Sequence, residues 1–383
     1  MTRELLKGNL AIAETAIRVG LDAYFGYPIT PQTELLEWMS RRMVEEERVF
    51  LQAESELAAI NMVYGAACTG ARVMTSSSGP GISLMMEGIS YIAATEVPFV
   101  LVDVMRAGPG LGNIDAAQSD YNQIIHGGGH GDYHQIVLAP STIQESIDYT
   151  VLAFDLAEKY RMVTVVLIDG IIGQMMEPGI LPEMKPARTK QPDWIPPKWA
   201  VRGKEGHDRH LLTSIHMSPT LEEGLNLRLL KQWREIRLKE TRYKEYYLDD
   251  AEIVVVGFGT AGRVALSAVR TARSYGIKVG LFRPISLRPF PEEALEKLVD
   301  QTKAFLVVEM NTGQMYKDIK KIVSNQSRVE FYGRVGGVIP FPDEILSEIR
   351  RISSMSYQSE NIDPIDAWIQ RLEDIRKTEA VGR

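Results

Sequence analysis

The chain has 383 residues, of which 45% are hydrophobic, and it carries a formal net charge of −7 at pH 7. This length suggests two domains, and the apolar content is enough for sizeable cores, which argues against global disorder. The acidic balance argues against a general affinity for nucleic acid or for anionic membranes. The single cysteine, Cys68, excludes an internal disulfide and a cysteine-ligated iron–sulfur cluster within this chain. Because no apolar run could span a bilayer and no apolar signal region opens the chain, we expect a cytoplasmic protein.

The first residues predict an alternation of helices and strands. Residues 8–18 have the apolar spacing of an amphipathic helix, and residues 23–27 form a short apolar run typical of a strand. Pro28 ends that strand, Thr30 suits a helix N-cap, and Pro31 suits the first helical position. The simplest interpretation of Thr30 is that cap, but a cap at the carboxyl end of a strand also lies where α/β proteins bind ligands.

The stretch from 52 to 86 predicts a short strand, a helix, a second strand, a glycine-rich turn and a second helix. Glu54 and Glu56 open the first helix, and residues 72–76 form the second strand. The turn is Ser-Ser-Gly-Pro-Gly at 77–81. A carboxylate at a helix start beside a strand that ends in a glycine turn is how an α/β protein builds a ligand-binding crevice.

Residues 99–105 are nearly all apolar and predict a central parallel strand. Asp103 interrupts this run and needs a partner. Arg106 follows the strand and precedes a glycine-rich segment, so it could receive an anionic group of a substrate, or it could form a surface ion pair. A helix over 141–160 and a buried strand over 163–168 complete a first domain that we place at residues 1–180.

Three histidines at positions 126, 130 and 134 have a spacing that would put them on one face of a helix, as metal ligands often are. Four glycines lie among them, which makes a helix improbable, and we therefore predict a glycine loop and no metal site.

The second half begins with a change of composition, because proline, lysine and histidine become frequent after Leu181. We assign residues 181–248 to an extended connector lying on a surface and a long charged helix, residues 249–352 to a second α/β domain, and residues 353–383 to a polar tail with one helical patch.

A glycine pattern at 257–262, Gly-Phe-Gly-Thr-Ala-Gly, follows a predicted strand and opens a predicted helix. This spacing matches the dinucleotide-binding fingerprint, which also needs an acid at the end of the next strand to hold the ribose. That strand, at 278–282, is followed by Arg283 instead of an acid. A nicotinamide-dependent dehydrogenase therefore stays open as an alternative, beside the simpler interpretation of a tight strand–helix turn.

Several motifs occur together and in order along almost the whole chain. They are YPITP at 27–31, ESELAAINMVYGA from 54, SSGPG at 77–81, MRAGPGLGN from 105, LFRPISLRPFP at 281–291 and VVEMNTGQM at 307–315. This set resembles the alpha subunit of the 2-oxoacid:ferredoxin oxidoreductases. The resemblance implies two doubly wound parallel-sheet domains, one like a thiamine pyrimidine-binding domain and one like a transketolase C-terminal domain.

The same resemblance implies an activity, cofactors and partners. Enzymes of this family use thiamine diphosphate to convert a 2-oxoacid and coenzyme A to an acyl-CoA, carbon dioxide and reduced ferredoxin. The diphosphate and Mg²⁺ half of the cofactor site lies on a beta subunit, and this sequence agrees, since it lacks the Gly-Asp-Gly segment that marks that half. The iron–sulfur clusters are then expected on partner chains, and the expected partners are beta, gamma and ferredoxin-like subunits and ferredoxin.

The resemblance also assigns roles to residues. Glu56 matches the glutamate that hydrogen-bonds the pyrimidine ring nitrogen of the cofactor, Thr30 matches a threonine beside the substrate, and Arg106 matches an arginine that meets the substrate carboxylate. The cofactor pocket is expected to include Tyr27, Pro28, Ile29, Ser78 and Gly79. The segment after Arg106 looks most like members that use branched-chain or aryl 2-oxoacids, and a 2-oxoglutarate enzyme is the alternative within the family.

Overall fold

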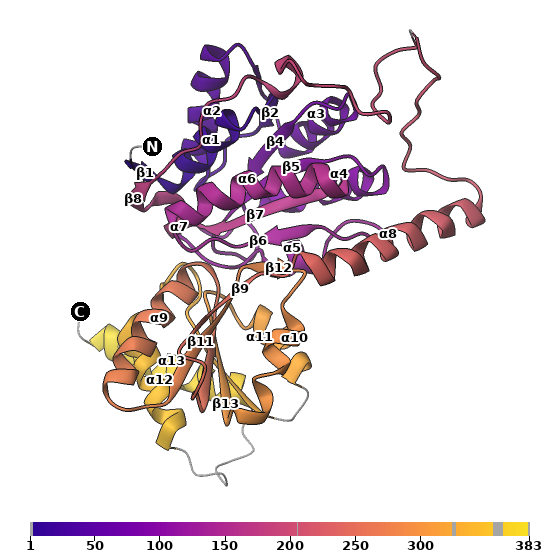
Figure 1. Ribbon diagram of the computed structural model, residues 1–383. Coiled ribbons are helices and arrows are strands. Elements are labelled where there is room, and N and C mark those ends of the chain that lie inside the picture. Colours follow the sequence, from indigo (N-terminus) through magenta and orange to yellow (C-terminus); the bar gives the residue numbers. More distant parts are fainter. Residues whose placement is uncertain (1–2, 205, 324–326, 355–362, 382–383) are drawn as a thin grey trace. The chain divides into compact units, whose positions relative to one another are not determined.

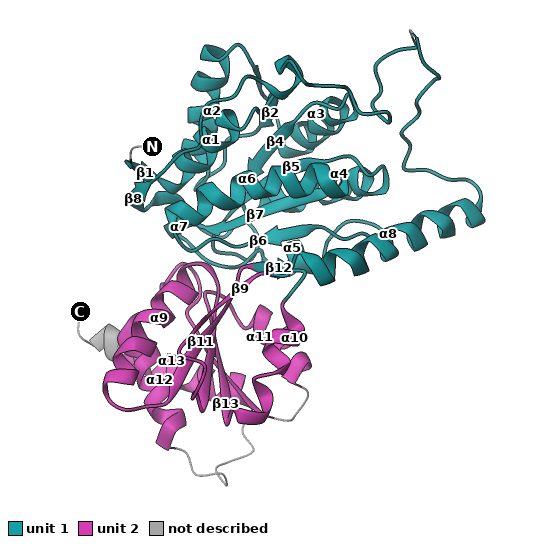
Figure 2. Cartoon of the chain, viewed as in Figure 1, with its two compact units in different colours: residues 1–241, 286–290 teal, residues 242–285, 291–383 magenta. Residues whose placement is uncertain are grey.

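The computed structural model describes residues 3–204, 206–323, 327–354 and 363–381, and the chain divides into two compact units (Figures 1 and 2). Unit 1 contains residues 1–241 together with a short return segment at 286–290. Unit 2 contains residues 242–285 and 291–383. The connector and the long charged helix therefore belong to unit 1. Within the described ranges, no helix combines the length and the apolar character needed to cross a membrane.

Unit 1 is built around a seven-stranded sheet. Its strands are β2 (Ala23–Gly26), β3 (Val49–Gln52), β4 (Val73–Ser77), β5 (Phe99–Met105), β6 (Ile136–Leu138), β7 (Val163–Asp169) and β12 (Ser286–Arg288). Their order across the sheet is β12-β6-β7-β5-β4-β2-β3, and every pairing is parallel except that of β12 with β6. Strands β5 and β7 are buried along their whole length, which is why their sequences are continuous apolar runs.

Helices pack on both faces of this sheet. The helices of unit 1 are α1 (Gly8–Arg18), α2 (Thr33–Glu45), α3 (Glu56–Cys68), α4 (Pro80–Ala94), α5 (Tyr121–Ile125), α6 (Ile143–Tyr160), α7 (Gly170–Gln174), the 3-10 turn η1 (Arg188–Lys190) and α8 (Pro219–Lys239). Helices α1, α2 and α6 share one core with Val100, Val102 and Val104 of β5. Because successive side chains of a strand point to opposite faces, Asp103 points away from that core. A two-stranded sheet, β1 (Glu4–Lys7) with β8 (Met176–Gly179), completes the unit.

Unit 2 has a five-stranded sheet in the order β14-β13-β10-β11-β9. The strands are β9 (Tyr243–Tyr246), β10 (Ile253–Val256), β11 (Val279–Pro284), β13 (Ala304–Glu309) and β14 (Arg328–Gly333), and only β9 runs antiparallel to its neighbour. The helical elements are α9 (Gly259–Ser274), α10 (Glu292–Glu296), η2 (Val299–Gln301), α11 (Gln314–Val323), α12 (Pro342–Ser354) and α13 (Pro364–Val381). Helix α13 confirms the helical patch predicted in the tail. Residues 355–362 and 382–383 of the predicted tail lie outside the described residues.

Three local predictions are wrong. Helix α2 begins at Thr33 and not at Pro31, so Thr30 is not its cap. The residue before α2, Gln32, is fully buried and tied to neighbouring loops, since its side chain donates to Tyr27 O at 2.9 Å and accepts from Ser76 Oγ at 2.8 Å.

The other two errors concern the ends of helices. Helix α3 starts at Glu56, because Ser55 is the N-cap and its Oγ accepts from Ala58 N at 3.2 Å, which leaves Glu54 outside the helix. We assigned residues 181–248 to the connector and the charged helix, but α8 ends at Lys239 and residues 243–246 form the edge strand β9 of unit 2.

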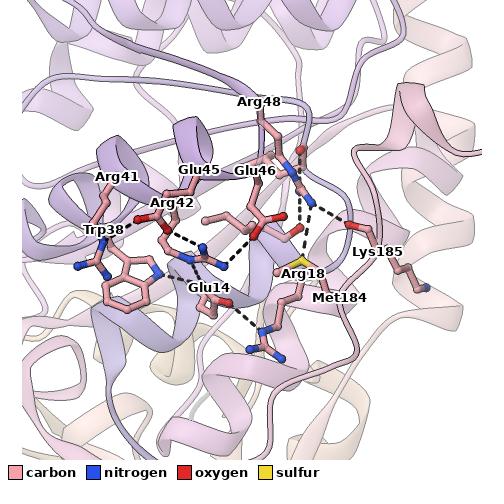
Figure 3. Close-up of polar contacts among 12 residues, drawn as sticks. Glu14, Arg18, Trp38, Arg41, Arg42, Glu45, Glu46, Arg48, Met184 and Lys185 are labelled. Atoms are coloured by element: carbon pink, nitrogen blue, oxygen red, sulfur yellow. Dashed lines mark hydrogen bonds and ion pairs between the residues drawn. The ribbon is translucent and has the colours of Figure 1, made fainter.

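The connector lies on unit 1, as predicted, and Arg48 is one of the residues that attach it. The Arg48 guanidinium donates to Lys185 O of the connector at 2.7 Å and to Leu21 O at 2.9 Å (Figure 3). The connector is therefore hydrogen-bonded to the loop that precedes β2, and it extends unit 1 instead of acting as a free linker.

A buried carboxylate joins the first two helices of unit 1. Glu14 of α1 accepts hydrogen bonds from Arg18 Nε and Trp38 Nε1, both at 2.9 Å, and from Arg42 Nε of α2 at 3.3 Å (Figure 3). Burial alone would raise the pKa of Glu14, but the hydrogen bonds from Trp38, Arg18 and Arg42 outweigh it, and the pKa lies below the ordinary value. The folded form therefore favours the ionised carboxylate.

Glu14→Gln should lower the free energy of unfolding by about 2–3 kcal/mol, since two arginines lose a buried charged partner. The pKa of Glu14 is depressed in the folded state, so this difference should be present above the unfolded pKa and vanish as the pH falls through the folded pKa. Urea unfolding measures it. The matched control is Glu45→Gln, whose carboxylate also bonds Arg42 but is 48% exposed, and it should cost at most about 1 kcal/mol. Equal losses in both variants would contradict the role of Glu14.

Candidate active site

The residues that the sequence predicts for the site lie at the carboxyl ends of neighbouring parallel strands. In the sheet order, β4 lies between β5 and β2, so the segments that follow these three strands share one edge. The predicted residues Tyr27 to Thr30 follow β2, Ser78 and Gly79 follow β4, and Arg106 follows β5. This edge is where α/β folds bind ligands.

Glu56 is buried at the first position of α3, with 4% of its surface exposed. In the described part of the chain, its carboxyl group has no hydrogen-bond or ion-pair partner. By contrast, Glu54 lies before the helix and is exposed. A carboxyl group at the edge of a buried helix start, without a partner among the described residues, is free to bind a polar group of a ligand.

The glycine turn after β4 makes room for that carboxyl group. A Cβ atom on Gly81 would lie 2.3 Å from Glu56 Oε1 and 2.2 Å from Ser77 Oγ, so only glycine fits there. Gly79 has a φ of +49°, a conformation that glycine adopts with little strain. The hydroxyl groups of Ser77 and Ser78 are buried and, among the described residues, have no hydrogen-bond partner.

Thr30 and Arg106, which lie 76 positions apart, meet at this edge. Arg106 is 6% exposed, and its Nη1 donates to Thr30 O at 2.9 Å while its Nη2 donates to Leu111 O at 2.9 Å. Its Nε is buried without a partner among the described residues and faces the turn, 3.5 Å from where a Cβ on Gly79 would stand. The guanidinium thus holds two loops together through main-chain oxygens and keeps one donor directed at the glycine turn.

The remaining predicted residues lie in the loop after β2. Tyr27, Pro28 and Ile29 are half-buried, and Thr30 is exposed, with its Oγ1 3.5 Å from Thr33 Oγ1. Glu56, the YPIT loop, the Ser-Gly turn and Arg106 are therefore joined within unit 1 by the sheet and by the contacts of Arg106, as the sequence predicts.

A pair of carboxyl groups behind the turn is not evident from the sequence. Asp103 of β5 is fully buried, and neither of its oxygens has a donor among the described residues. The side chain that it contacts is Asp120, which accepts from Gly79 N at 3.0 Å and from Gln123 Nε2 at 2.7 Å. Asp120 follows Asp103 by 17 positions, and the one available signal was the isolated acid within an apolar strand.

The two carboxyl groups of this pair differ in protonation. Burial, and then the charge of Asp120, raise the pKa of Asp103 well above its usual range. Burial raises the pKa of Asp120 to about 6, although the Gly79 N–H, Gln123 and Arg106 favour its ionised form. These shifts favour the protonated form of Asp103 beside Asp120, and the Asp120 carboxylate accepts from the Gly79 amide. The pair therefore fixes the conformation of the glycine turn.

The features that fit a bound cofactor are thus a partnerless buried carboxyl group, unpaired serine hydroxyls and a turn where a side chain is excluded. They suit a flat heterocycle with ring nitrogens, because carboxyl and hydroxyl groups can both donate to and accept from such a ring.

Comparison with known proteins agrees with this fit. Residues 14–214 match the family described as pyruvate flavodoxin/ferredoxin oxidoreductase, thiamine diphosphate-binding, and residues 251–345 match pyruvate:ferredoxin oxidoreductase core domain II. The second match covers the glycine pattern at 257–262. In the structure a Cβ on Gly262 would lie 2.5 Å from Gly257 O, so the strand–helix turn itself requires glycine at this position.

Two relatives that align along nearly the whole chain are oxidoreductase or synthase subunits that act on different 2-oxoacids. The chain is 51% identical over 356 residues to the ketoisovalerate oxidoreductase subunit VorB of Methanothermobacter thermautotrophicus, covering 93% of this chain and 99% of that protein. It is 38% identical over 372 residues to the 2-oxoglutarate synthase subunit KorA of Methanothermobacter marburgensis, with 91% and 99% covered.

A solved structure of a 2-oxoacid:ferredoxin oxidoreductase is also similar to this chain. The 2-oxoglutarate:ferredoxin oxidoreductase of Magnetococcus marinus, solved with 2-oxoglutarate, coenzyme A and succinyl-CoA bound, aligns with a TM-score of 0.82 at 26% identity, over 92% of this chain and 66% of that chain. A split-gene transketolase shares the fold alone, with a TM-score of 0.53 at 12% identity.

These findings define a thiamine-diphosphate-type α/β protein with two parallel-sheet domains, which confirms the predicted fold class. The chain belongs to the 2-oxoacid:ferredoxin oxidoreductase family, as an alpha-type subunit, and the predicted family is therefore confirmed.

Asp103→Asn should stabilise the protein increasingly as the pH rises. Folding raises the pKa of Asp103, so the wild type loses stability between the unfolded value, about 3.9, and the folded value, whereas asparagine does not titrate. The gain should approach about 1.4 kcal/mol per pH unit in that window, and the asparagine amide can donate to Asp120 permanently.

Chemical denaturation between about pH 4 and pH 7 measures this difference. Asp115→Asn, at an exposed carboxylate in the same segment, is the matched control and should change little. A stability difference for Asp103→Asn that stays constant over this range would show that Asp103 is not protonated in the folded protein.

Proposed function

We propose that the chain is the catalytic alpha-type subunit of a cytoplasmic enzyme that oxidatively decarboxylates a branched-chain or aryl 2-oxoacid. With coenzyme A as acceptor, the products are an acyl-CoA, carbon dioxide and reduced ferredoxin. The observation that carries this proposal is the buried, partnerless carboxyl group of Glu56 at the glycine turn, in a domain that matches thiamine-diphosphate-binding proteins.

The cofactor site is divided between subunits. The chain supplies the pyrimidine half, while the diphosphate and Mg²⁺ are assigned to a beta subunit, because the sequence lacks a Gly-Asp-Gly segment. The iron–sulfur clusters are assigned to the gamma or ferredoxin-like subunits, since one cysteine cannot ligate a cluster. Ferredoxin is the proposed electron acceptor.

Glu56 is assigned to the pyrimidine ring of the cofactor. When bound, thiamine diphosphate would supply a nucleophilic carbon for the decarboxylation of a 2-oxoacid. Glu56 would hold a proton at a ring nitrogen of the pyrimidine and so assist proton transfer by the cofactor. Ser78 and Gly79 border the same ring, and the half-buried residues Tyr27, Pro28 and Ile29 exclude water from it.

Arg106 and Thr30 are assigned to the substrate. A guanidinium is suited to a carboxylate by charge and by the geometry of its donors, and the buried Nε of Arg106 still lacks a partner in the described part of the chain. Thr30 lies on the same edge and presents an exposed hydroxyl group that can contact the carboxylate or the 2-oxo group. Both side chains thereby orient the substrate.

The loop after Arg106 supports an apolar substrate side chain. It presents Leu111 and Ile114, which are 79% and 61% exposed. Residues 107–118 contain no lysine or arginine that could pair with the second carboxylate of 2-oxoglutarate, and they do contain Asp115. The higher identity to a ketoisovalerate subunit than to the 2-oxoglutarate synthase subunits supports the same choice.

Glu56→Gln in the assembled enzyme should keep the fold and the cofactor occupancy, because the amide is nearly isosteric and can donate a hydrogen bond. It cannot exchange a proton with the ring nitrogen, so acyl-CoA formation and hydrogen–deuterium exchange at the thiazolium carbon should both fall by about 10²–10⁴-fold. The matched control, Glu54→Gln, changes an exposed carboxylate two positions away and should leave both rates unchanged. If Glu56→Gln left the exchange rate intact, the pyrimidine role would be rejected.

Arg106→Ala should lower kcat/KM for the 2-oxoacid about ten- to a hundredfold, since a charge-assisted contact contributes about 1.5–3 kcal/mol. The assay uses a branched-chain, an aryl and a dicarboxylic 2-oxoacid, and the wild type should prefer the first two. A wild-type preference for 2-oxoglutarate would overturn the substrate choice.

The same variant separates two roles of Arg106. A raised KM with an unchanged thermal midpoint supports contact with the substrate carboxylate. A lowered midpoint with an unchanged KM would limit Arg106 to holding the loops of Thr30 and Leu111.

A further inference from the structure

Unit 1 contains a cavity of about 300 Å³ at the amino ends of β4 and β5. Its floor includes Val73 and Phe99, which begin these two strands. Because the strands are parallel, this edge of the sheet is opposite to the edge that carries Glu56 and Arg106. The cavity is therefore separate from the candidate active site.

The walls of the cavity combine flat apolar side chains with cations. The last turn of α6 and the connector supply most of them, and the aromatic and proline residues are Phe99, Phe154, Trp194, Trp199, Pro98 and Pro197. Four cations also line it, Arg72, Lys159, Arg161 and Arg188, against one carboxylate, Glu158. A lining with this excess of positive charge favours an anion, and its flat surfaces favour a planar ring.

Two of the four cations already have carboxylate partners. Arg72 Nε is 2.6 Å from Glu158, and Lys159 Nζ is 2.8 Å from Glu240. Arg188 has a weaker contact, because Asp193 is 3.9 Å away and 82% exposed. The cavity therefore depends on Arg188 and Arg161 for any charge that a ligand could use.

Arg161 differs from the other cations. Its Nε donates to Glu96 O at 2.9 Å and its guanidinium lies 4.8 Å above the centre of the Trp199 ring. The Glu96 carboxylate is bound to Arg228 at 2.6 Å, and in the described residues Arg161 forms no ion pair with a carboxylate. The Glu96 carboxylate still acts on Arg161 electrostatically, but its ion pair is with Arg228. A half-buried cation that shares its carboxylate in this way, at the wall of a cavity, is a site where a bound anion is favourable.

The backbone at Arg161 gives a second observation. Arg161 is the C-cap of α6 and adopts a left-handed conformation, with φ +49° and ψ +57°. Glycine is the usual residue at such a helix end, since it has no Cβ to strain. A cation near a helix C-terminus also interacts favourably with the helix dipole, but that interaction does not need a strained residue stacked on a tryptophan.

We propose that this cavity binds an aromatic anion, with its ring against the tryptophan-lined wall and its anionic group on Arg161 and Arg188. A volume near 300 Å³ is at the small end of ligand pockets, which limits the ligand to about one ring system and one anionic group. A mononucleotide and an aryl carboxylate both have this chemistry. The site is independent of the proposed reaction.

The experiment measures binding to the assembled enzyme by calorimetry and by quenching of tryptophan fluorescence. The probes are two aromatic anions, adenosine monophosphate and indole-3-acetate. The control ligands are adenosine and indole, which have only the ring, and inorganic phosphate, which has only the charge. Either aromatic anion should bind more tightly than its ring or phosphate alone, and the tighter of the two identifies the source of the ligand.

Arg161→Gly is the test variant, because glycine relieves the left-handed strain and keeps the fold while removing the cation. Affinity for the tighter probe should fall at least about tenfold, while the thermal midpoint and the 2-oxoacid activity stay unchanged. Arg41→Ala is the matched control, since Arg41 lies 4.7 Å above Trp38 on α2 and does not line the cavity.

Two results would overturn the proposal. One is the failure of both aromatic anions to bind wild type more tightly than adenosine, indole and phosphate do. The other is binding that Arg161→Gly leaves intact or that Arg41→Ala weakens equally. Neither result bears on the 2-oxoacid activity, which the same preparation reports separately.

Discussion

The site depends on the close approach of α3 and α4. The carboxyl group of Glu56 occupies the space where a side chain at position 81 would stand, and a Cβ on Gly88 would lie 2.7 Å from Ile60 of α3. Two glycines on one helix therefore let the other helix come near enough to place a buried carboxyl group beside the turn after β4. The backbone of that turn is held in addition by Asp120, so the position of Glu56 follows from packing together with one hydrogen-bonded loop.

Regular elements could be predicted from the sequence because their signal is local. The helix at 8–18 and the strand at 99–105 have the predicted bounds, since burial of a repeated apolar pattern decides them. The start of α2 could not be predicted, because it depends on a hydrogen bond that Gln32 Oε1 accepts from Ser76 Oγ, 44 positions further along the chain.

In the candidate site, too, local motifs could be predicted from the sequence, whereas contacts between distant segments could not. The motifs of the site, and their positions at the ends of strands, can be recognised in the sequence. In the structure, Arg106 donates a hydrogen bond to the main-chain oxygen of Thr30. The partner of Asp103 was not predictable, because Asp120 lies beyond a glycine-rich loop whose path no local pattern specifies. The position of the Arg161 guanidinium at a cavity wall was not predictable either, since the cavity is formed by α6 and by a connector without apolar periodicity.

The return of the chain to unit 1 at β12 limits where the protein can be cut into separate fragments. Ser286–Arg288 pairs with β6 at the edge of the first sheet, although the segments before and after it belong to unit 2. A fragment that stops at Thr241 would leave β6 as an open edge, with main-chain donors and acceptors free to pair with another chain. Gene fusions and truncations in this part of the chain therefore have to carry residues 286–290 with the first unit, or they create an aggregation-prone sheet.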